Sequence, residues 1–132
     1  MSPDNMYLSE SDVVKLGDFG LNRLFEHSNS KRQHHCSTYT APEVLEGRSC
    51  LKSDVWSLGY STTEMAQGRD TFLLYEGEKL KERILKNDPP SLSASHGWSN
   101  EFMDFVSRCL VRDVEKRASV AELLNVSVTE MR

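Results

Sequence analysis

The spacing of apolar residues along the chain predicts a mainly α-helical protein with a small β element near its start. Val13, Val14 and Leu16 form a short apolar run that Gly17 and Gly20 interrupt, a pattern that favours a strand pair over a helix. Beyond residue 40, apolar residues recur at helical spacing in several separate segments. We therefore expect a short β pair near residues 6–18, followed by about five helices.

The segment 22–40 between these two parts has no sustained period. It is rich in serine, histidine, asparagine and basic residues, so we expect it to form a mobile loop. Pro42 then suits the first turn of a short helix, and Gly47 suits its end.

A longer helix is predicted over residues 51–68, with Ser53 or Asp54 as its cap and Gly68 as its stop. Gly59 in its middle costs roughly 1 kcal/mol relative to alanine, so we expect a close-packing reason for it. The predicted buried stripe consists of Val55, Leu58 and Met65.

Three further helices follow along the chain. One is predicted over residues 74–87, and a second over 99–113 has Ser99 as its cap. The last helix opens with a capping box made by Ser119 and Glu122. The core-facing side of the second helix consists of Phe102, Phe105, Val106, Cys109 and Leu110.

Composition narrows the class of protein. The 132 residues suit one domain, with 38% apolar and 27% charged residues, which is polar for a compact globule and suits a part that packs on another part. The net charge of −4 gives no reason to expect nucleic acid or an anionic membrane as a partner. We expect neither a membrane span nor a signal peptide.

The spacing of the cysteines indicates neither a disulfide framework nor a zinc site. Cys36, Cys50 and Cys109 are odd in number and far apart, so we interpret them as reduced thiols of a cytosolic or nuclear protein. His34 and His35 beside Cys36 raise a zinc hypothesis. Adjacent loop residues cannot all face one ion without help, and no fourth ligand is evident, so we do not favour it.

Four short motifs follow one another along the chain in a characteristic order. Asp18-Phe19-Gly20 is followed by Ala41-Pro42-Glu43, by SDVWSLG at residues 53–59 and by Arg117-Ala118-Ser119. One such match arises by chance in many chains, but this order and spacing resemble the large lobe of eukaryotic protein kinases. The resemblance covers roughly residues 2–125. SDVWSLG looks more like the Ser/Thr branch than the tyrosine kinase branch.

The resemblance implies a fold and a domain organisation. Residues 1–125 look like a partial protein kinase domain, from the end of the catalytic loop to the last helix, and residues 126–132 look like a tail. The implied fold is a helical C-terminal lobe with a β pair, without an N-terminal lobe. The sequence VKLGDFGLNR is similar to NIMA-like kinases and the segment around 98–124 to Sterile-20 or germinal-centre-like kinases, so the subfamily stays open.

The resemblance also implies a magnesium site. Kinase catalytic loops end in a proline and an asparagine, which Pro3 and Asn5 match, so Asn5 and Asp18 would hold the metal of Mg-ATP. Amide and carboxylate oxygens are ligands that magnesium prefers. The alternative is that Asn5 is a solvated terminal residue.

Other parts that the family needs for catalysis do not occur in the sequence. The catalytic aspartate would precede Met1, and the glycine-rich loop and ATP-binding lysine belong to the small lobe. Ser2, His35 and Cys36 stand where the family carries lysine, glycine and threonine. We therefore expect the chain alone to be inactive, and to bind ATP only if an N-terminal lobe is supplied.

Structural roles are implied for four residues. The resemblance pairs Glu43 with Arg117 in the interior, makes Asp54 a cap for the catalytic loop and packs Trp56 near Pro42.

The activation segment of the family matches the loop over residues 22–40, where an added phosphate would pair with basic side chains. The alternative is an exposed polar loop without regulation. The basic residues are Arg23, Lys31 and Arg32, and the possible phosphate acceptors are Ser28, Ser30, Ser37, Thr38 and Thr40.

Three functions remain open from the sequence. The chain is a piece of a Ser/Thr kinase, a non-catalytic kinase-like binder of substrates or regulatory proteins, or a degenerate remnant. A binder would dock its partners through helix 74–87 and the loop after it. In each case we expect marginal folding, because a lobe without its partner exposes apolar surface.

Overall fold

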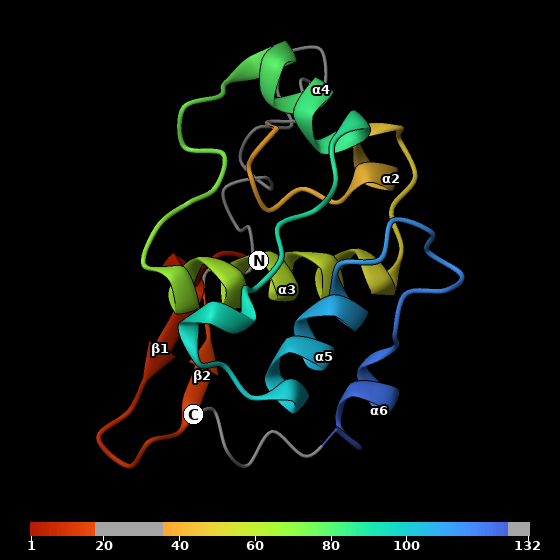
Figure 1. The fold of residues 1–132 in the computed structure, drawn as a ribbon. Coiled ribbons are helices and arrows are strands. Elements are labelled where there is room, and N and C mark those ends of the chain that lie inside the picture. Colours follow the sequence, from red (N-terminus) through yellow and green to blue (C-terminus); the bar gives the residue numbers. More distant parts are fainter. Residues whose placement is uncertain (18–35, 127–132) are drawn as a thin grey trace.

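The computed structural model describes residues 1–17 and 36–126. It is mostly helical, with one antiparallel pair of strands, as the apolar pattern predicted. Figure 1 shows α3 crossing the middle of the molecule, with α5 alongside it and with α2 and α4 on its other side. The elements in chain order are η1 (Pro3–Asn5), β1 (Met6–Leu8), β2 (Val14–Leu16), α2 (Pro42–Leu45), α3 (Leu51–Gln67), α4 (Gly77–Lys86), η2 (Ala94–His96), α5 (Asn100–Cys109) and α6 (Val120–Leu123).

The hairpin forms within the range that the sequence predicted. Met6 lies opposite Leu16, and Leu8 lies opposite Val14. The turn is closed by Ser9, whose side-chain oxygen accepts a hydrogen bond from the Val13 N–H at 3.0 Å. The hairpin projects to one side of the helices (Figure 1). Five of its large apolar side chains are more than half exposed, those of Tyr7, Leu8, Val13, Val14 and Leu16.

Helix α3 begins at Leu51, as predicted, but its cap differs. Its N-cap is Cys50, so the prediction of Ser53 or Asp54 as the cap is wrong. Ser53 lies at the third helical position, where its Oγ accepts the Cys50 N–H at 3.1 Å, the return bond of a capping box. Gly68 ends the helix in the left-handed conformation (φ 67°), as expected.

The buried face of α3 also differs from the predicted stripe. Val55 is buried, but the side chain of Met65 is 55% exposed. Small polar residues occupy much of the interior face, which a search for apolar residues does not detect. The buried residues of α3 are Ser53, Val55, Trp56, Ser57, Gly59, Tyr60, Ser61 and Thr63.

Gly59 has the close-packing reason that the sequence suggested. A Cβ atom built on it would lie 2.5 Å from Cys109 Cβ and 3.0 Å from Leu110 Cγ. The absence of a side chain therefore lets α3 approach α5 closely. One core cluster joins Trp56 and Tyr60 of α3 to Phe102 and other residues of α5.

The remaining helices follow the sequence in most respects. Ser99 caps α5 by accepting the Phe102 N–H at 3.2 Å, and Ser119 with Glu122 forms the predicted capping box of α6. Helix α4 begins only at Gly77, later than predicted, and Leu74 before it is 91% exposed. Within the described residues, no helix is both long and apolar enough to cross a bilayer.

Candidate functional site

The hairpin places Asn5 beside Gly17. The Gly17 N–H donates to the Asn5 carbonyl oxygen at 3.0 Å, which extends the pairing of β1 with β2 by one step. The ring of Tyr7 covers Gly17, because a Cβ atom there would lie 2.7 Å from Tyr7 Cε2. Asn5 thus lies beside the residue that precedes Asp18 in the sequence, while Asp18 itself lies outside the described residues.

The segment 36–40 is a turn fastened to α3, which contrasts with the mobile loop expected there. The Thr40 N–H donates to the Ser37 carbonyl at 2.9 Å, and the Ser37 N–H donates to Thr40 Oγ1 at 3.0 Å. Tyr39 Oη donates to Glu64 Oε2 at 2.6 Å, and Ser57 Oγ donates to the Tyr39 carbonyl at 2.8 Å. Two residues of α3 therefore hold the end of this segment.

Tyr39 belongs to a cluster of two phenols and two carboxylates. The ring of Tyr39 meets that of Tyr60 edge to face, with centroids 5.5 Å apart. Tyr60 Oη donates to Asp70 Oδ1 at 2.7 Å. Burial, the hydrogen bond to Glu64 and the nearby negative charges all raise the pKa of Tyr39, and burial with the Asp70 bond does the same for Tyr60. Both phenols therefore stay protonated as hydrogen-bond donors at neutral pH.

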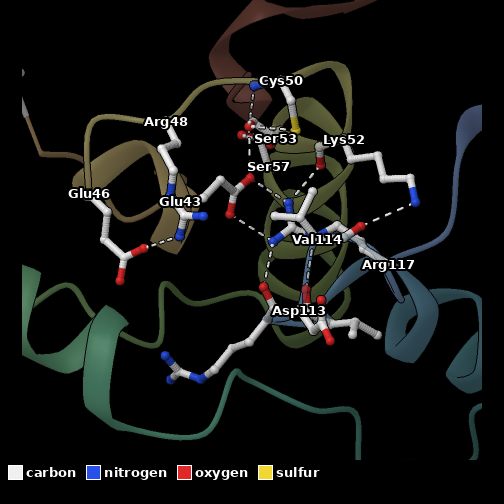
Figure 2. A network of polar contacts seen from close by, with 12 residues as sticks. Glu43, Glu46, Arg48, Cys50, Lys52, Ser53, Ser57, Asp113, Val114 and Arg117 are labelled. Atoms are coloured by element: carbon white, nitrogen blue, oxygen red, sulfur yellow. Dashed lines mark hydrogen bonds and ion pairs between the residues drawn. The ribbon is translucent and has the colours of Figure 1, made fainter.

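A buried ion pair joins α2 to the loop before α6. Arg117 Nη1 donates to Glu43 Oε1 at 2.7 Å, and Arg117 Nη2 donates to Glu43 Oε2 at 2.9 Å. Figure 2 shows both side chains pointing toward one another beside α3. Ser53 Oγ adds a third bond, donating to Glu43 Oε1 at 2.7 Å. The carboxylate is thus held by three donors inside the protein.

The environment of this pair favours the ionised form of the Glu43 carboxyl. Burial acts to raise the pKa of the Glu43 carboxyl, but the hydrogen bonds from Arg117 and Ser53 outweigh it, and the pKa lies below its ordinary value. Arg117 also donates to the carbonyls of Lys52 and Val111, both at 2.8 Å. Its guanidinium lies 5.2 Å from the centre of the Trp56 ring. With its donors saturated, this pair is suited to holding the fold and not to proton transfer.

The other residues singled out from the sequence are spread over the molecule. Asp54 is exposed on α3, whereas Trp56 is buried in the same core cluster as Ala41. Cys36 is half-buried, and desolvation raises the pKa of its thiol. The residues that lie outside the described ranges are Asp18, Arg23, Ser28, Ser30, Lys31, Arg32, His34 and His35.

Sequence reasoning missed several residues that hold this region together. Lys52 Nζ donates to the carbonyls of Val114 and Glu115 at 3.1 and 3.2 Å. Arg112 Nη1 donates to the carbonyls of Ile84 and Leu85. The acceptors of these bonds are backbone carbonyls, which every residue has, so the side-chain pattern of the sequence cannot predict the bonds. Only Ser53 and Ser57 could have been identified from the sequence as buried polar residues, because they are one helical turn apart on the buried face of α3.

A family model identifies the kind of protein that this geometry belongs to. The model described as "Protein kinase domain" matches residues 1–128. The chain belongs to the protein kinase domain family. The recognition of this family from the four ordered motifs is thereby confirmed.

Curated relatives place this kinase-family chain beside eukaryotic serine/threonine kinases. It is 37% identical over 124 residues to "Serine/threonine-protein kinase hippo" of Drosophila melanogaster, covering 91% of the chain and 18% of that protein. It is 35% identical to "Serine/threonine-protein kinase pakA" of Dictyostelium discoideum, covering 92% of the chain and 10% of that protein. It is 37% identical to "Serine/threonine-protein kinase dst2" of the same organism, covering 91% of the chain and 11% of that protein. The chain therefore spans less than a fifth of the length of these relatives.

Proposed function

We propose that the chain forms the C-terminal lobe of a Ser/Thr protein kinase that transfers phosphate from Mg-ATP to proteins. In this proposal residues 1–125 are the partial kinase domain and residues 126–132 are a tail. The family match and the printed names of the relatives support the reaction class. The observation that carries the proposal is the hydrogen bond between Gly17 and Asn5. Asn5 is one metal-ligand candidate, and Gly17 directly precedes the other candidate, Asp18, in the sequence.

Asn5 and Asp18 would hold the magnesium ion of Mg-ATP. The Asn5 side chain is partly exposed at the end of η1 and next to the strand pair, so an amide oxygen is available there. An amide and a carboxylate oxygen suit a metal that takes few protein ligands and completes its shell with phosphate oxygens and water. The ion would neutralise charge on the phosphates, and the two residues would fix its place.

The exposed hairpin supports the assignment to a lobe. Tyr7, Leu8, Val13, Val14 and Leu16 are each more than half exposed on one small ribbon. An apolar group of this kind is uncommon on the free surface of a soluble protein and marks a surface that packs against something else. A second lobe packed on this hairpin would bury these side chains and complete the nucleotide site.

A non-catalytic function is the second candidate. Ser2 and Cys36 depart from the residues that the family uses around the catalytic aspartate, and no glycine-rich G-x-G-x-x-G motif occurs in the 132 residues. Phosphoryl transfer depends on positioning the nucleotide, so in this proposal the 132 residues do not transfer phosphate by themselves. A kinase-like binder would instead use α4 and the exposed Leu73 and Leu74 before it to contact proteins.

Calorimetry of Mg-ATP binding tests the proposal. With an N-terminal lobe supplied, we expect binding that requires magnesium and that Asp18→Asn abolishes. Asp88→Asn, in an exposed loop, is the matched control. Loss of binding in Asn5→Ala as well would support the pair of ligands. Binding that survives both substitutions would contradict the metal site. No binding in any sample would favour the non-catalytic binder.

A further inference from the structure

The hairpin of β1 and β2 has two faces, and Tyr7 lies on the less apolar one. Side chains alternate along a strand, so the register pairs Tyr7 with Lys15 on one face, while the other face is apolar throughout. The Gly17 N–H donates to the Asn5 carbonyl at 3.0 Å, which continues the pairing by one residue beyond Leu16. Gly17 therefore lies on the face of Tyr7, at the diagonal position across the two strands.

The ring of Tyr7 takes the place of the side chain that Gly17 lacks. A Cβ atom built on Gly17 would lie 2.7 Å from Tyr7 Cε2 and 3.3 Å from Cδ2, so a side chain there would displace the ring. An aromatic ring over a cross-strand glycine offsets the conformational freedom and the missing packing of that residue. Tyr7 is 55% exposed, so burial in the core does not account for a ring at this position. Its contact with Gly17 does.

The step of the hairpin that the ring covers is the one that supports the proposed magnesium site. Asn5 is one candidate ligand, and Gly17 directly precedes the other candidate, Asp18, in the sequence. Consecutive Cα atoms are about 3.8 Å apart, so Gly17 limits how far that residue can lie from Asn5. A binding site needs its ligands held to within about 0.5 Å, and a glycine without cover weakens a strand pair at that point.

We propose that Tyr7 is a positioning residue for the magnesium site. Its ring packs on Gly17 and holds the hydrogen bond between Gly17 and Asn5 in place, and it does not itself bind the metal. The inference rests on the proposed function, because it concerns the site that Asn5 and Asp18 would form. It adds to that site a residue that acts through a contact across the hairpin.

Amide hydrogen exchange in the 132-residue chain tests this contact without any nucleotide. The probe is the Gly17 N–H. The reference is the Ser9 N–H, which donates to the Val13 carbonyl at 2.9 Å at the other end of the hairpin. Tyr7→Leu keeps an apolar side chain but removes the ring, so we expect Gly17 to exchange about two- to fivefold faster and Ser9 to stay unchanged. Tyr7→Phe keeps the ring and should leave both rates unchanged.

Two results of the exchange experiment would overturn the proposal. One is an unchanged exchange rate of Gly17 in Tyr7→Leu, which would mean that the ring does not hold this step. The other is an equal acceleration at Gly17 and Ser9, which would mean that Tyr7 only stabilises the hairpin as a whole.

Calorimetry with an N-terminal lobe supplied tests the effect on the metal. The measured quantity is the ratio of the Kd of ATP without magnesium to its Kd with magnesium. Tyr7→Leu should lower this ratio about two- to fivefold, because the metal site loses its fixed geometry, while Tyr7→Phe should leave it unchanged. A side chain that only contacts the nucleotide, or only supports the fold, changes both Kd values by the same factor. An unchanged ratio in Tyr7→Leu would therefore overturn the proposal.

A double-variant cycle shows whether Tyr7 acts through Gly17. Gly17→Ala puts a Cβ atom where the ring lies, so the ring must swing aside and the contact is lost. In the Gly17→Ala background, Tyr7→Leu should then change the ratio by less than about 1.5-fold. An equal fall in both backgrounds would contradict the proposal. Absence of Mg-ATP binding in every sample would contradict the proposed function and its metal site, whereas the exchange rate of Gly17 would still decide whether Tyr7 holds this step.

Discussion

Arg117 and Glu43, which are 74 positions apart in the sequence, form a two-pronged ion pair in which both side chains are almost fully buried. The pair joins α2 to the loop that precedes α6. Its guanidinium also binds carbonyls at the start of α3 and after α5. One side chain thus links α2, α3 and the loop between α5 and α6, so its loss should affect the whole helical part.

Removing one partner of this pair should therefore destabilise the protein severely. Arg117→Met leaves the Glu43 carboxylate buried with only Ser53 as a donor. We expect a loss of about 3–5 kcal/mol in the free energy of unfolding, measured by urea denaturation followed by circular dichroism. The double variant Glu43→Met with Arg117→Met should recover much of the loss, because it leaves no buried charge.

The matched control is the exposed pair of Arg48 with Glu46. Arg48→Met should change the free energy of unfolding by less than about 1 kcal/mol. Equal losses in Arg117→Met and Arg48→Met would show that burial does not decide the strength of the pair.

The same pair predicts how stability depends on pH. The pKa of Glu43 is lower in the folded protein than its ordinary value of 4.5. The folded state therefore favours the ionised carboxylate, so this contribution is fully present above pH 4.5 and is lost as the pH falls through the folded pKa. Urea titrations at several pH values below 4.5 should show a steep fall for the wild type. Glu43→Gln should show a shallower one, and parallel curves would contradict the assignment.

Local signals in the sequence predicted local structure well. The caps at Ser99 and at Ser119 with Glu122 involve residues three positions apart, so one short stretch contains the whole interaction. The cap of α3 was missed because cysteine is not a usual capping residue. Met65 was misplaced because packing against α5 filled the interior face with small residues, which the spacing of apolar residues does not reveal.

Contacts between distant residues were accessible from the sequence only where a family motif contained both partners. Glu43 and Arg117 belong to two of the ordered motifs, and the resemblance to the kinase family pairs them. Tyr39 with Glu64 and Arg112 with the end of α4 had no such guide. Their partners lie on separate elements, and only the packing of those elements brings them within hydrogen-bond distance.

Gly59 should resist replacement even by alanine. Alanine favours the helix by roughly 1 kcal/mol, but its Cβ would lie 2.5 Å from Cys109 Cβ, so α3 and α5 must separate. We expect a net loss of about 1–3 kcal/mol by overpacking, measured by thermal or urea unfolding. Met65→Ala on the exposed side of the same helix should stay within about 0.5 kcal/mol. A more stable Gly59→Ala protein would show that the two helices are not in such close contact.

Tyr39→Phe should loosen the segment 36–40 without unfolding the protein. It removes the donor to the Glu64 carboxylate, a bond to a charged group that contributes about 1.5 kcal/mol. Cys36 lies in the same segment and is half-buried, so its thiol should react faster with a disulfide reagent in the variant. Tyr7→Phe, at an exposed ring, is the control and should leave the rate unchanged. If both variants react at the wild-type rate, the Tyr39–Glu64 bond does not hold the segment.

The exposed hairpin should limit the stability of the chain in isolation. Its apolar side chains contribute little to folding while they face water, so we expect a thermal transition below about 55 °C, in the lower mesophile range. Leu16→Thr on this ribbon should improve solubility and change the free energy of unfolding by less than about 0.5 kcal/mol. A loss well above that value would mean that the side chain is covered in the isolated chain. In that case the exposure of the hairpin would no longer support a second lobe packed upon it.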